Sequence, residues 1–344
     1  NLITNKRNSD YYNVINAKPN FYKNGNNYTT AYNFTKDTTY LADKNYLLMN
    51  GQKAAEMNNI DSYNAFINSD GQYQCIITEN DKQYIGKFSS EGGMQKTGPY
   101  DVVKNIYAPI TDSPVPMEGE DKQAQNLFKD KNGNYGYILI QNGKASIMFG
   151  NNIINTDYTD MLEISFDYDK AGNLTYIAKS NGIFYSGYGN EFVVQGNKKW
   201  NDFNSVTAPV KFTKDNLPVY VITDSINDNT YISRLVVGND VYKVMNSSKT
   251  VTIDGYSGGI FDVNISDNGG ISFTGQAQII SKNSDGYDEY SYKTVNVTNG
   301  VEGKAYYNQG VKRYNKSGAG LFCGATDKSD RKISLFFSSG NDTK

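Results

Sequence analysis

Phe128-Lys-Asp-Lys-Asn-Gly133 and Phe166-Asp-Tyr-Asp-Lys-Ala-Gly172 each follow a short apolar segment and end in a glycine before a second apolar strand begins. Asp-Gly and Asn-Gly sequences supply the positive φ values that tight hairpin turns need. Related turns read Ile67-Asn-Ser-Asp-Gly71, Ile265-Ser-Asp-Asn-Gly269, Phe212-Thr-Lys-Asp215-Asn216 and Tyr314-Asn-Lys-Ser-Gly318. This recurrence indicates an internal repeat, and a repeat decides the architecture of the whole chain.

Two further strands follow each turn at regular intervals. The second strands are expected at 72–78, 135–141, 174–179, 217–223, 270–275 and 318–324. The third strands are expected at 46–50, 84–88, 145–150, 192–196, 235–238, 294–299 and 333–337. Four short strands per unit, repeated about seven times with a spacing of roughly 40 to 60 residues, predict a β-propeller.

Composition supports an all-β chain. It contains 29 Tyr and 32 Gly but one Trp, and long helical patterns are missing. Tyr suits half-buried strands because its ring packs while its hydroxyl stays in water. We therefore predict one domain over residues 1–344, a single propeller of four-stranded blades, with seven blades as the best count and six or eight as alternatives.

The two ends of the chain are expected to meet. The first unit has two candidate turns, Asn24-Gly25 and Lys36-Asp37. We favour the second, because residues 38–41 and 46–50 then match the strands of later units. The last unit stops after its third strand, so the N-terminal segment 1–28 is expected to complete that blade and close the ring, which leaves no unpaired edge.

The order of apolar strand, Asp/Asn-Gly turn, apolar strand and Val-rich strand resembles the WD40-like repeats of TolB-type bacterial propellers. In that family the turn typically reads Ser-Pro-Asp-Gly, whereas no copy here has the proline. The Trp common before the turn is replaced here by Phe, Ile or Tyr. The resemblance covers most of residues 30–340. It implies the propeller fold and brings no catalytic residues with it.

Charge and hydropathy limit the classes of partner and the cellular locations that we expect. The formal net charge is −2 and no block of Lys or Arg occurs, so a nucleic-acid partner is not expected. The longest apolar runs, such as 219–222, are too short for a transmembrane segment. Because Asn1 is not an initiator Met, we expect a mature form of a secreted, cell-surface or periplasmic protein, with no visible signal peptide.

The chain has no histidine, which removes Ser-His-Asp catalysis, histidine bases and the usual zinc sites. Asp130, Asn132 and Asn134 have the spacing of calcium ligands, but they lie on the recurrent hairpin turn, where such residues serve turn geometry. We therefore predict no metal and no cofactor. Cys75 and Cys323 fall on strands of different units and are expected to be buried thiols rather than a disulfide.

Two long insertions are the candidate binding sites. They span 110–125 and 281–290, and we place both on the face that carries the loops between second and third strands. Loops on a rigid scaffold are where binding residues usually lie, although length variation alone explains many long loops. The candidate residues are Glu118, Glu120, Asp121, Asp285, Tyr287, Asp288, Glu289 and Tyr290.

These observations favour a non-enzymatic binding or assembly module that contacts a protein, its own copies or a glycan. Self-association into a filament or surface structure belongs to this hypothesis, since head-to-tail contacts do not close. The alternative is an extracellular carbohydrate-active enzyme with two carboxylates about 5 to 9.5 Å apart near the central channel. A periplasmic accessory protein of TolB type is a third hypothesis, which rests on analogy of fold.

Overall fold

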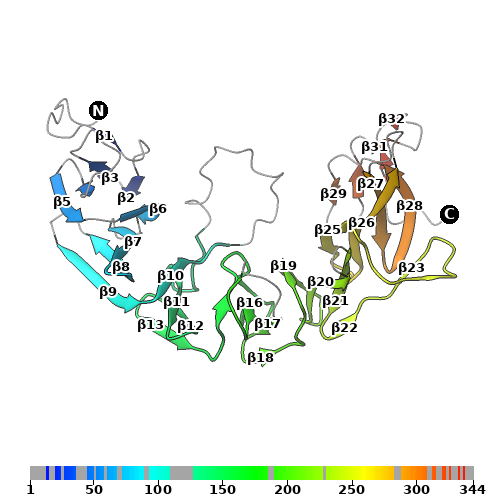
Figure 1. The fold of residues 1–344 in the computed structure, drawn as a ribbon, viewed down its shortest axis with the longest axis horizontal. Coiled ribbons are helices and arrows are strands. Elements are labelled where there is room, and N and C mark those ends of the chain that lie inside the picture. Colours follow the sequence, from blue (N-terminus) through cyan, green and yellow to red (C-terminus); the bar gives the residue numbers. More distant parts are fainter. Residues whose placement is uncertain are drawn as a thin grey trace. The chain divides into compact units, whose positions relative to one another are not determined.

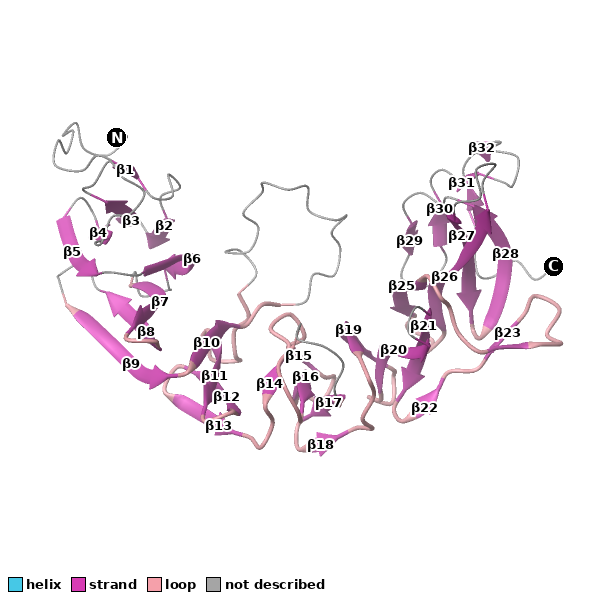
Figure 2. Ribbon diagram, in the orientation of Figure 1, coloured by secondary structure: helices cyan, strands magenta, loops and turns pink. Residues whose placement is uncertain are grey.

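The computed structural model consists of strands joined by turns, without a helix in the residues that it describes (Figure 2). Accordingly, no helix in this part of the chain is long and apolar enough to cross a membrane. The described residues are 13–14, 20–24, 27–35, 45–49, 52–57, 60–67, 72–88, 93–108, 127–184, 190–227, 230–282, 288–307, 312–314, 320–322, 325–326, 332–333 and 336–337.

Contacts between residues divide the chain into two compact units, of which unit 1 comprises Asn1–Tyr107 and Ser113–Asp157. Unit 1 holds three sheets (Figure 1). The first has the order β1-β3-β4-β5 with β2 also paired to β3, the second β6-β7-β8-β9 and the third β10-β11-β12-β13. The strands are β1 Asn13–Val14, β2 Asn20–Asn24, β3 Asn27–Thr35, β4 Asn45–Met49, β5 Gln52–Met57, β6 Ile60–Ile67, β7 Tyr73–Glu79, β8 Lys82–Phe88, β9 Met94–Tyr100, β10 Val102–Asn105, β11 Gly136–Gln141, β12 Lys144–Phe149 and β13 Asn152–Asn155.

Unit 2 comprises Ala108–Asp112 and Tyr158–Lys344 and holds four sheets. Two of them are β14-β16-β17-β18, with β15 beside β16, and β19-β20-β21-β22. The others are an eight-stranded sheet built on β24-β23-β28-β27-β26-β25 with β31 and β32, and β29-β30-β33. That the whole chain is one domain stays a prediction.

The strands of unit 2 are β14 Asp160–Met161, β15 Asp167–Tyr168, β16 Leu174–Lys179, β17 Glu191–Gln195, β18 Lys198–Lys199, β19 Val206–Phe212, β20 Pro218–Asn227, β21 Thr230–Val237, β22 Asp240–Val241, β23 Val244–Met245, β24 Thr252–Ile253, β25 Gly259–Ile265, β26 Ile271–Lys282, β27 Asp288–Thr298, β28 Val301–Tyr307, β29 Lys312–Tyr314, β30 Gly320–Phe322, β31 Ala325–Thr326, β32 Lys332–Ile333 and β33 Phe336–Phe337. In the four-stranded sheets, strands that follow one another along the chain pair antiparallel.

The predicted second and third strands form the centres of these sheets. Each predicted second strand overlaps one of β7, β11, β16, β20, β26 and β30. Six predicted third strands overlap β4, β8, β12, β17, β21 and β27. The seventh, at 333–337, is wrong as a single strand, because its residues divide between β32 and β33, which belong to different sheets.

The repeated turn has the same backbone hydrogen bond in four sheets, from the N–H of its first residue to the carbonyl oxygen of its fifth. The four pairs are Asp130 to Asn134, Asp169 to Asn173, Thr213 to Leu217 and Ser266 to Gly270, each 2.9 Å. The fourth residue is left-handed every time, with φ of 83° at Gly133, 80° at Gly172, 62° at Asn216 and 86° at Gly269. The turn prediction is thus confirmed in these sheets, while the turns at 67–71 and 314–318 include residues outside the described ones.

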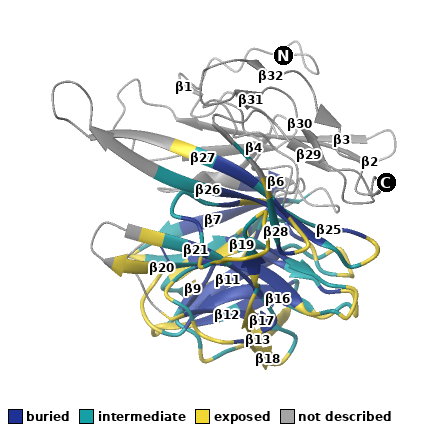
Figure 3. Ribbon diagram, turned by 90° about the vertical axis from the view of Figure 1, so that its right-hand side faces the viewer, coloured by how far each residue is buried: buried dark blue, intermediate teal, exposed yellow. Residues whose placement is uncertain are grey.

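Within unit 2, the sheet β19–β22 packs face to face with the sheets before and after it. In the sheet β19–β22, Tyr220, Ile222 and Val236 pack with Ile177 and Val193 of the preceding sheet. The alternating side chains Val219, Val221 and Leu235 pack with Phe273, Val295 and Val297 of the following one. Both faces of a blade-like sheet are therefore buried, which is the packing expected of propeller blades. Figure 3 shows burial concentrated on middle strands such as β11, β12 and β16.

The first sheet corrects two expectations. β2 and β3 form a hairpin in which Asn24 pairs with Asn27, so the turn lies at Asn24-Gly25 and our preference for Lys36-Asp37 was wrong. β1 also pairs with β3. Residues 13–14, 20–24 and 27–28 thus contribute to the first sheet rather than to the last, because the β2–β3 hairpin offers a local partner. For residues 1–12 and 15–19, which lie outside the described residues, completion of the last blade stays a prediction.

Cys75 is a buried thiol, as predicted. It lies on β7 with 1% of its surface exposed. Cys323 lies outside the described residues.

Candidate functional site

Three ionisable residues stand in one row across the sheet β14–β18. The register pairs Asp160 of β14 with Lys179 of β16, and Lys179 with Glu191 of β17. Directly paired residues on neighbouring strands project to the same face of a sheet. All three are buried, with exposed fractions of 0%, 1% and 7%. A lysine between two carboxylates inside a protein is a natural candidate for a functional site.

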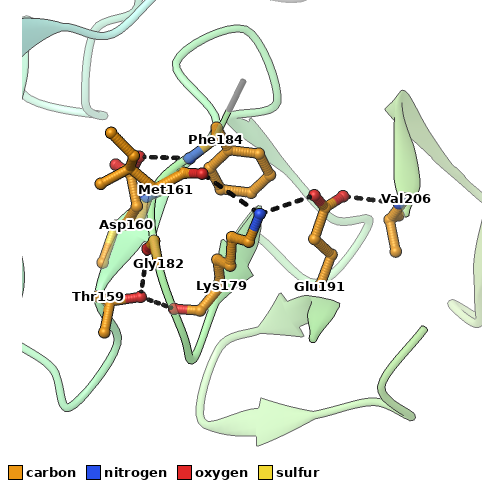
Figure 4. A network of polar contacts seen from close by, with 9 residues as sticks. Thr159, Asp160, Met161, Lys179, Gly182, Phe184, Glu191 and Val206 are labelled. Carbon is orange, nitrogen blue, oxygen red and sulfur yellow. Dashed lines mark hydrogen bonds and ion pairs between the residues drawn. The ribbon is translucent and has the colours of Figure 1, made fainter. Parts of the chain in front are cut away.

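The contacts of the row hold loops in place (Figure 4). Asp160 accepts hydrogen bonds from the backbone N–H groups of Met161, at 2.8 Å, and Phe184, at 2.9 Å. The Lys179 ammonium donates to the carbonyl oxygen of Ile183 at 3.3 Å. The Asp160 and Lys179 side chains thus fix residues 183–184, which begin the connection between β16 and β17.

Glu191 links the row to the next sheet. One carboxylate oxygen lies 3.7 Å from the Lys179 Nζ, and the other accepts the N–H of Val206, the first residue of β19, at 2.8 Å. Burial raises the pKa of Glu191, although the Val206 hydrogen bond and the Lys179 charge oppose that effect. Both Glu191 carboxylate oxygens are buried and face protein donors. The row therefore has the geometry of a structural contact between two sheets.

At the opposite end of the same sheet, the single carboxylate of Asp169 is surrounded by amide donors. Asp169 accepts hydrogen bonds from the backbone N–H of Asn173, at 2.7 Å, and from the side-chain amides of Asn173, Gln195 and Asn216, at 2.8 to 3.0 Å. These four donors hold the pKa of Asp169 at about 2, against the opposing effect of burial. Since Asn216 belongs to the turn before β20, Asp169 also ties two sheets together.

The calcium-like spacing at Asp130 serves its turn, as predicted. Its carboxylate accepts the N–H of Asn132 at 2.9 Å and the N–H and side-chain amide of Asn134 at 2.7 and 2.9 Å. No group of three or more His, Cys, Asp or Glu in the described residues is arranged to hold a metal ion. At Asp130 the donors of the turn occupy the oxygens that a cation would need.

An open groove of about 630 Å³ lies between the sheet β19–β22 and the eight-stranded sheet. Leu217 and Val241 expose 40% and 49% of their surfaces there. Such exposed apolar walls beside rigid strands suit the binding of another molecule. The groove is lined by Leu217, Val237, Asp240, Val241, Tyr242, Lys243, Met245, Lys249, Asn299, Gly300 and Val301.

One glycine shapes the floor of this groove. Gly300 has a φ of +76°, and a side chain there would lie 2.8 Å from the carbonyl oxygen of Lys243. The Gly300 carbonyl accepts the N–H of Met245 at 2.8 Å. The β27–β28 turn therefore approaches the segment that leads from β22 to β23 closely, and only glycine permits that approach without strain.

The predicted binding residues fall in two different settings. Glu118, Glu120, Asp121, Asp285 and Tyr287 lie outside the described residues. Asp288, Glu289 and Tyr290 belong to β27, paired with residues 280–282 of β26, so they are strand residues of a long hairpin rather than loop residues. The segment 110–125 comes between β10 and β11, a first and a second strand, which corrects its assignment to the face of the second-to-third connections.

Sequence reasoning missed both the ionisable row and the groove. Lys179 ends an apolar strand and Glu191 begins the next one, an unusual placement for charges that offered a usable signal. The groove had no comparable signal, because its walls come from three separated segments, within 217, 237–249 and 299–301.

No protein-family model matches the chain, and no curated protein matches it either, so the resemblance to WD40-like and TolB-type repeats is not confirmed. A solved structure similar to it is the β-propeller domain of the Trilobed protease from Pyrococcus furiosus, at 9% identity over 94% of both chains with a TM-score of 0.32. Another is a mannose phosphorylase from Leishmania mexicana in complex with phosphate ion, at 9% identity over 92% of this chain and 80% of that chain, with a TM-score of 0.18. At these TM-scores neither likeness bears on the function.

Proposed function

We propose that the chain is a non-enzymatic propeller that binds a protein partner, and that the groove beside β22 receives an extended segment of that partner. The observation that carries this proposal is the groove itself, where Leu217 and Val241 of the sheet β19–β22 expose apolar surface. The short edge strand β22 beside this apolar wall suits an extended peptide, which gains main-chain hydrogen bonds and buries alternate side chains.

The proposal includes the finer architecture. The described residues form seven sheets, which supports seven blades, and their face-to-face packing supports a ring. We propose that the ring closes through the N-terminal segment and that the protein works outside the cytoplasm, secreted, on a cell surface or in a periplasm. Self-association into a filament or surface structure is a further mode of the same binding role.

The carboxylates of the ionisable row support a binding role over glycoside chemistry. A glycosidase needs two carboxyl groups open to substrate in a concave site. Asp160 instead holds two backbone N–H groups and Glu191 holds Val206 and faces Lys179, with at most 7% of either residue exposed. A substrate would have to displace these contacts before reaching either carboxylate.

Selection from a phage-displayed library of random peptides tests the groove. We expect selected peptides to bind the unmodified protein and to bind Val241→Asp at least about tenfold more weakly, because a charge in the apolar wall must be desolvated. Ile164→Asp is the matched control, since Ile164 is 42% exposed in the turn between β14 and β15 of the same unit, away from the groove. Equal binding to both variants, or no enrichment of any sequence, would defeat the proposal.

A further inference from the structure

The fourth strands of five sheets differ in how their free edges are protected. Charged residues and proline on an edge strand discourage pairing with another chain. β5 carries Lys53 and Glu56, β9 carries Lys96 and Pro99, β18 is Lys198–Lys199, and β22 contains Asp240. β13, Asn-Ile-Ile-Asn, has no charge and no proline, and all four of its residues are exposed.

The backbone of β13 offers hydrogen-bonding groups on its free side. β12 and β13 are joined by a two-residue turn, with Phe149 paired to Asn152. The closing pair of such a hairpin exchanges hydrogen bonds, and the direction of N–H and C=O then alternates along the strand. The N–H and C=O of Ile153 and Asn155 therefore point away from β12. β13 is the last strand of its sheet in the described part of the chain.

We propose that two copies of the chain pair through β13, antiparallel, across a twofold axis at Ile154. Ile153 of each copy then lies opposite Asn155 of the other, and these residues exchange about four backbone hydrogen bonds in total. This register is possible because Ile153 and Asn155, whose backbone groups point away from β12, lie on either side of Ile154.

The side chains suit a second copy as the occupant. Pairing of this neutral strand with itself opposes no like charges, whereas β18 in the same arrangement would oppose lysines. Ile153 and Ile154 expose 43% and 39% of their surfaces, so pairing covers apolar surface on both faces of the joined sheet. The contact is isologous and closes as a dimer.

This inference gives the self-association of the proposed function a closed dimer in place of a filament and is independent of the groove. A strand pair alone buries less than the roughly 1,200 Å² of a stable interface, so we expect a dissociation constant of roughly 10 to 100 µM. Sedimentation velocity over a concentration series spanning that range is expected to show the 38.3 kDa monomer converting to a species of twice that mass.

Two variants test the edge. Ile154→Lys is expected to raise the dissociation constant at least tenfold, while Met94→Lys, which places a lysine at a 45% exposed apolar residue of the edge strand β9, leaves it unchanged. Ile154→Cys is expected to form a disulfide between copies under mild oxidation, because residues on the axis form a close non-hydrogen-bonded pair, whereas Ile164→Cys does not. Circular dichroism checks that each variant folds.

Each contrary outcome has a definite meaning. A monomer at every concentration overturns the inference and leaves the groove proposal standing. A dimer that survives Ile154→Lys, or that Met94→Lys disrupts equally, places the contact elsewhere and also overturns it. Loss of peptide binding in the Val241→Asp variant with an intact dimer is expected, because the two surfaces belong to different sheets.

Discussion

The two ends of the sheet β14–β18 join the same neighbouring sheet in opposite ways. At one end Glu191 is buried beside Lys179 and accepts the N–H of Val206, and its pKa is raised by burial. At the other end Asp169 accepts four hydrogen bonds from neutral donors, and its pKa is lowered to about 2. A carboxylate can thus link two sheets in surroundings that disfavour its ionised form, as at Glu191, or in surroundings that favour the ionised form, as at Asp169.

This difference indicates which of the two contacts stabilises the packing between these sheets. Neutral N–H donors stabilise the Asp169 carboxylate and need no second buried charge. Glu191 has one strong backbone donor and a lysine at 3.7 Å, so part of its desolvation remains uncompensated. We expect the Asp169 end to contribute favourable stability at neutral pH and the Glu191 end to depend on its partner.

Removal of Lys179 is expected to have the largest effect. Lys179→Met leaves Glu191 buried without its cation and releases the Ile183 carbonyl, and we expect a loss of about 3 kcal/mol. The double variant Lys179→Met with Glu191→Gln is expected to lose less, since the Glu191 charge is then removed together with its cation. The shift of the urea midpoint measures both. A double variant less stable than Lys179→Met would show that the Lys179–Glu191 pair stabilises the fold beyond neutralising its two buried charges.

Asp169→Ala is expected to lower stability by about 2 kcal/mol, because a pKa of about 2 against an ordinary 3.8 corresponds to a little under two pH units at about 1.4 kcal/mol each. Asp130→Ala is the matched control. It occupies the same turn position but binds only within its own turn, and we expect a loss of about 1 kcal/mol. Equal losses in urea denaturation would mean that Gln195 and Asn216 add nothing to the turn.

Opposite pH dependences are expected from the two ends. The folded state binds the Glu191 proton more tightly than the unfolded state does, so this residue lowers stability as pH rises above its ordinary pKa of 4.5. Asp169 binds its proton less tightly when folded, so its contribution is present above 3.8 and is lost as pH falls toward 2.

Urea midpoints at a series of pH values separate these contributions. Glu191→Gln is expected to remove part of the decline in stability above pH 4.5, and Asp169→Asn part of the loss on acidification below 3.8. Asp101, whose pKa is lowered by Lys82 on the solvent-exposed surface, provides a control, since Asp101→Asn should change the acid limb much less. Parallel curves for the three variants would contradict the comparison.

The two ends also show what the sequence could and could not predict. The Asp169 turn is local, because residues 169–173 contain its geometry, and it was predicted together with the strands around it. The partners of Asp169 from β17 and the next turn lie 26 and 47 residues away, and nothing in their spacing marks them. The row at Lys179 likewise depends on register across three strands, which a pattern of alternating residues does not specify.

In the N-terminal region we preferred the turn Lys36-Asp37 over the local candidate Asn24-Gly25, because it matched the strand pattern of later units, and the β2–β3 hairpin shows that this preference was wrong. Completion of the last blade by residues outside the described ones stays a prediction. Local turn chemistry was the better guide, as it was at the turns of Asp130 and Asp169. The groove, built by 217, 237–249 and 299–301, required the packing of two sheets before it could be recognised.

The smallest expected changes in stability test whether the turns that begin at Asp130 and Asp169 are locally equivalent. Gly133 and Gly172 have φ values of 83° and 80°, so Gly133→Ala and Gly172→Ala should each cost about 1 kcal/mol through strain in the left-handed region. Nothing lies within 4 Å of a side chain at Gly133, which leaves backbone conformation as the cause there. Asn216 adopts φ 62° at the same turn position, so Gly133→Asn should cost less than Gly133→Ala. If Gly172→Ala cost several times more than Gly133→Ala, the contact between sheets at Asp169 would depend on the backbone of its turn, and the two turns would not be locally equivalent.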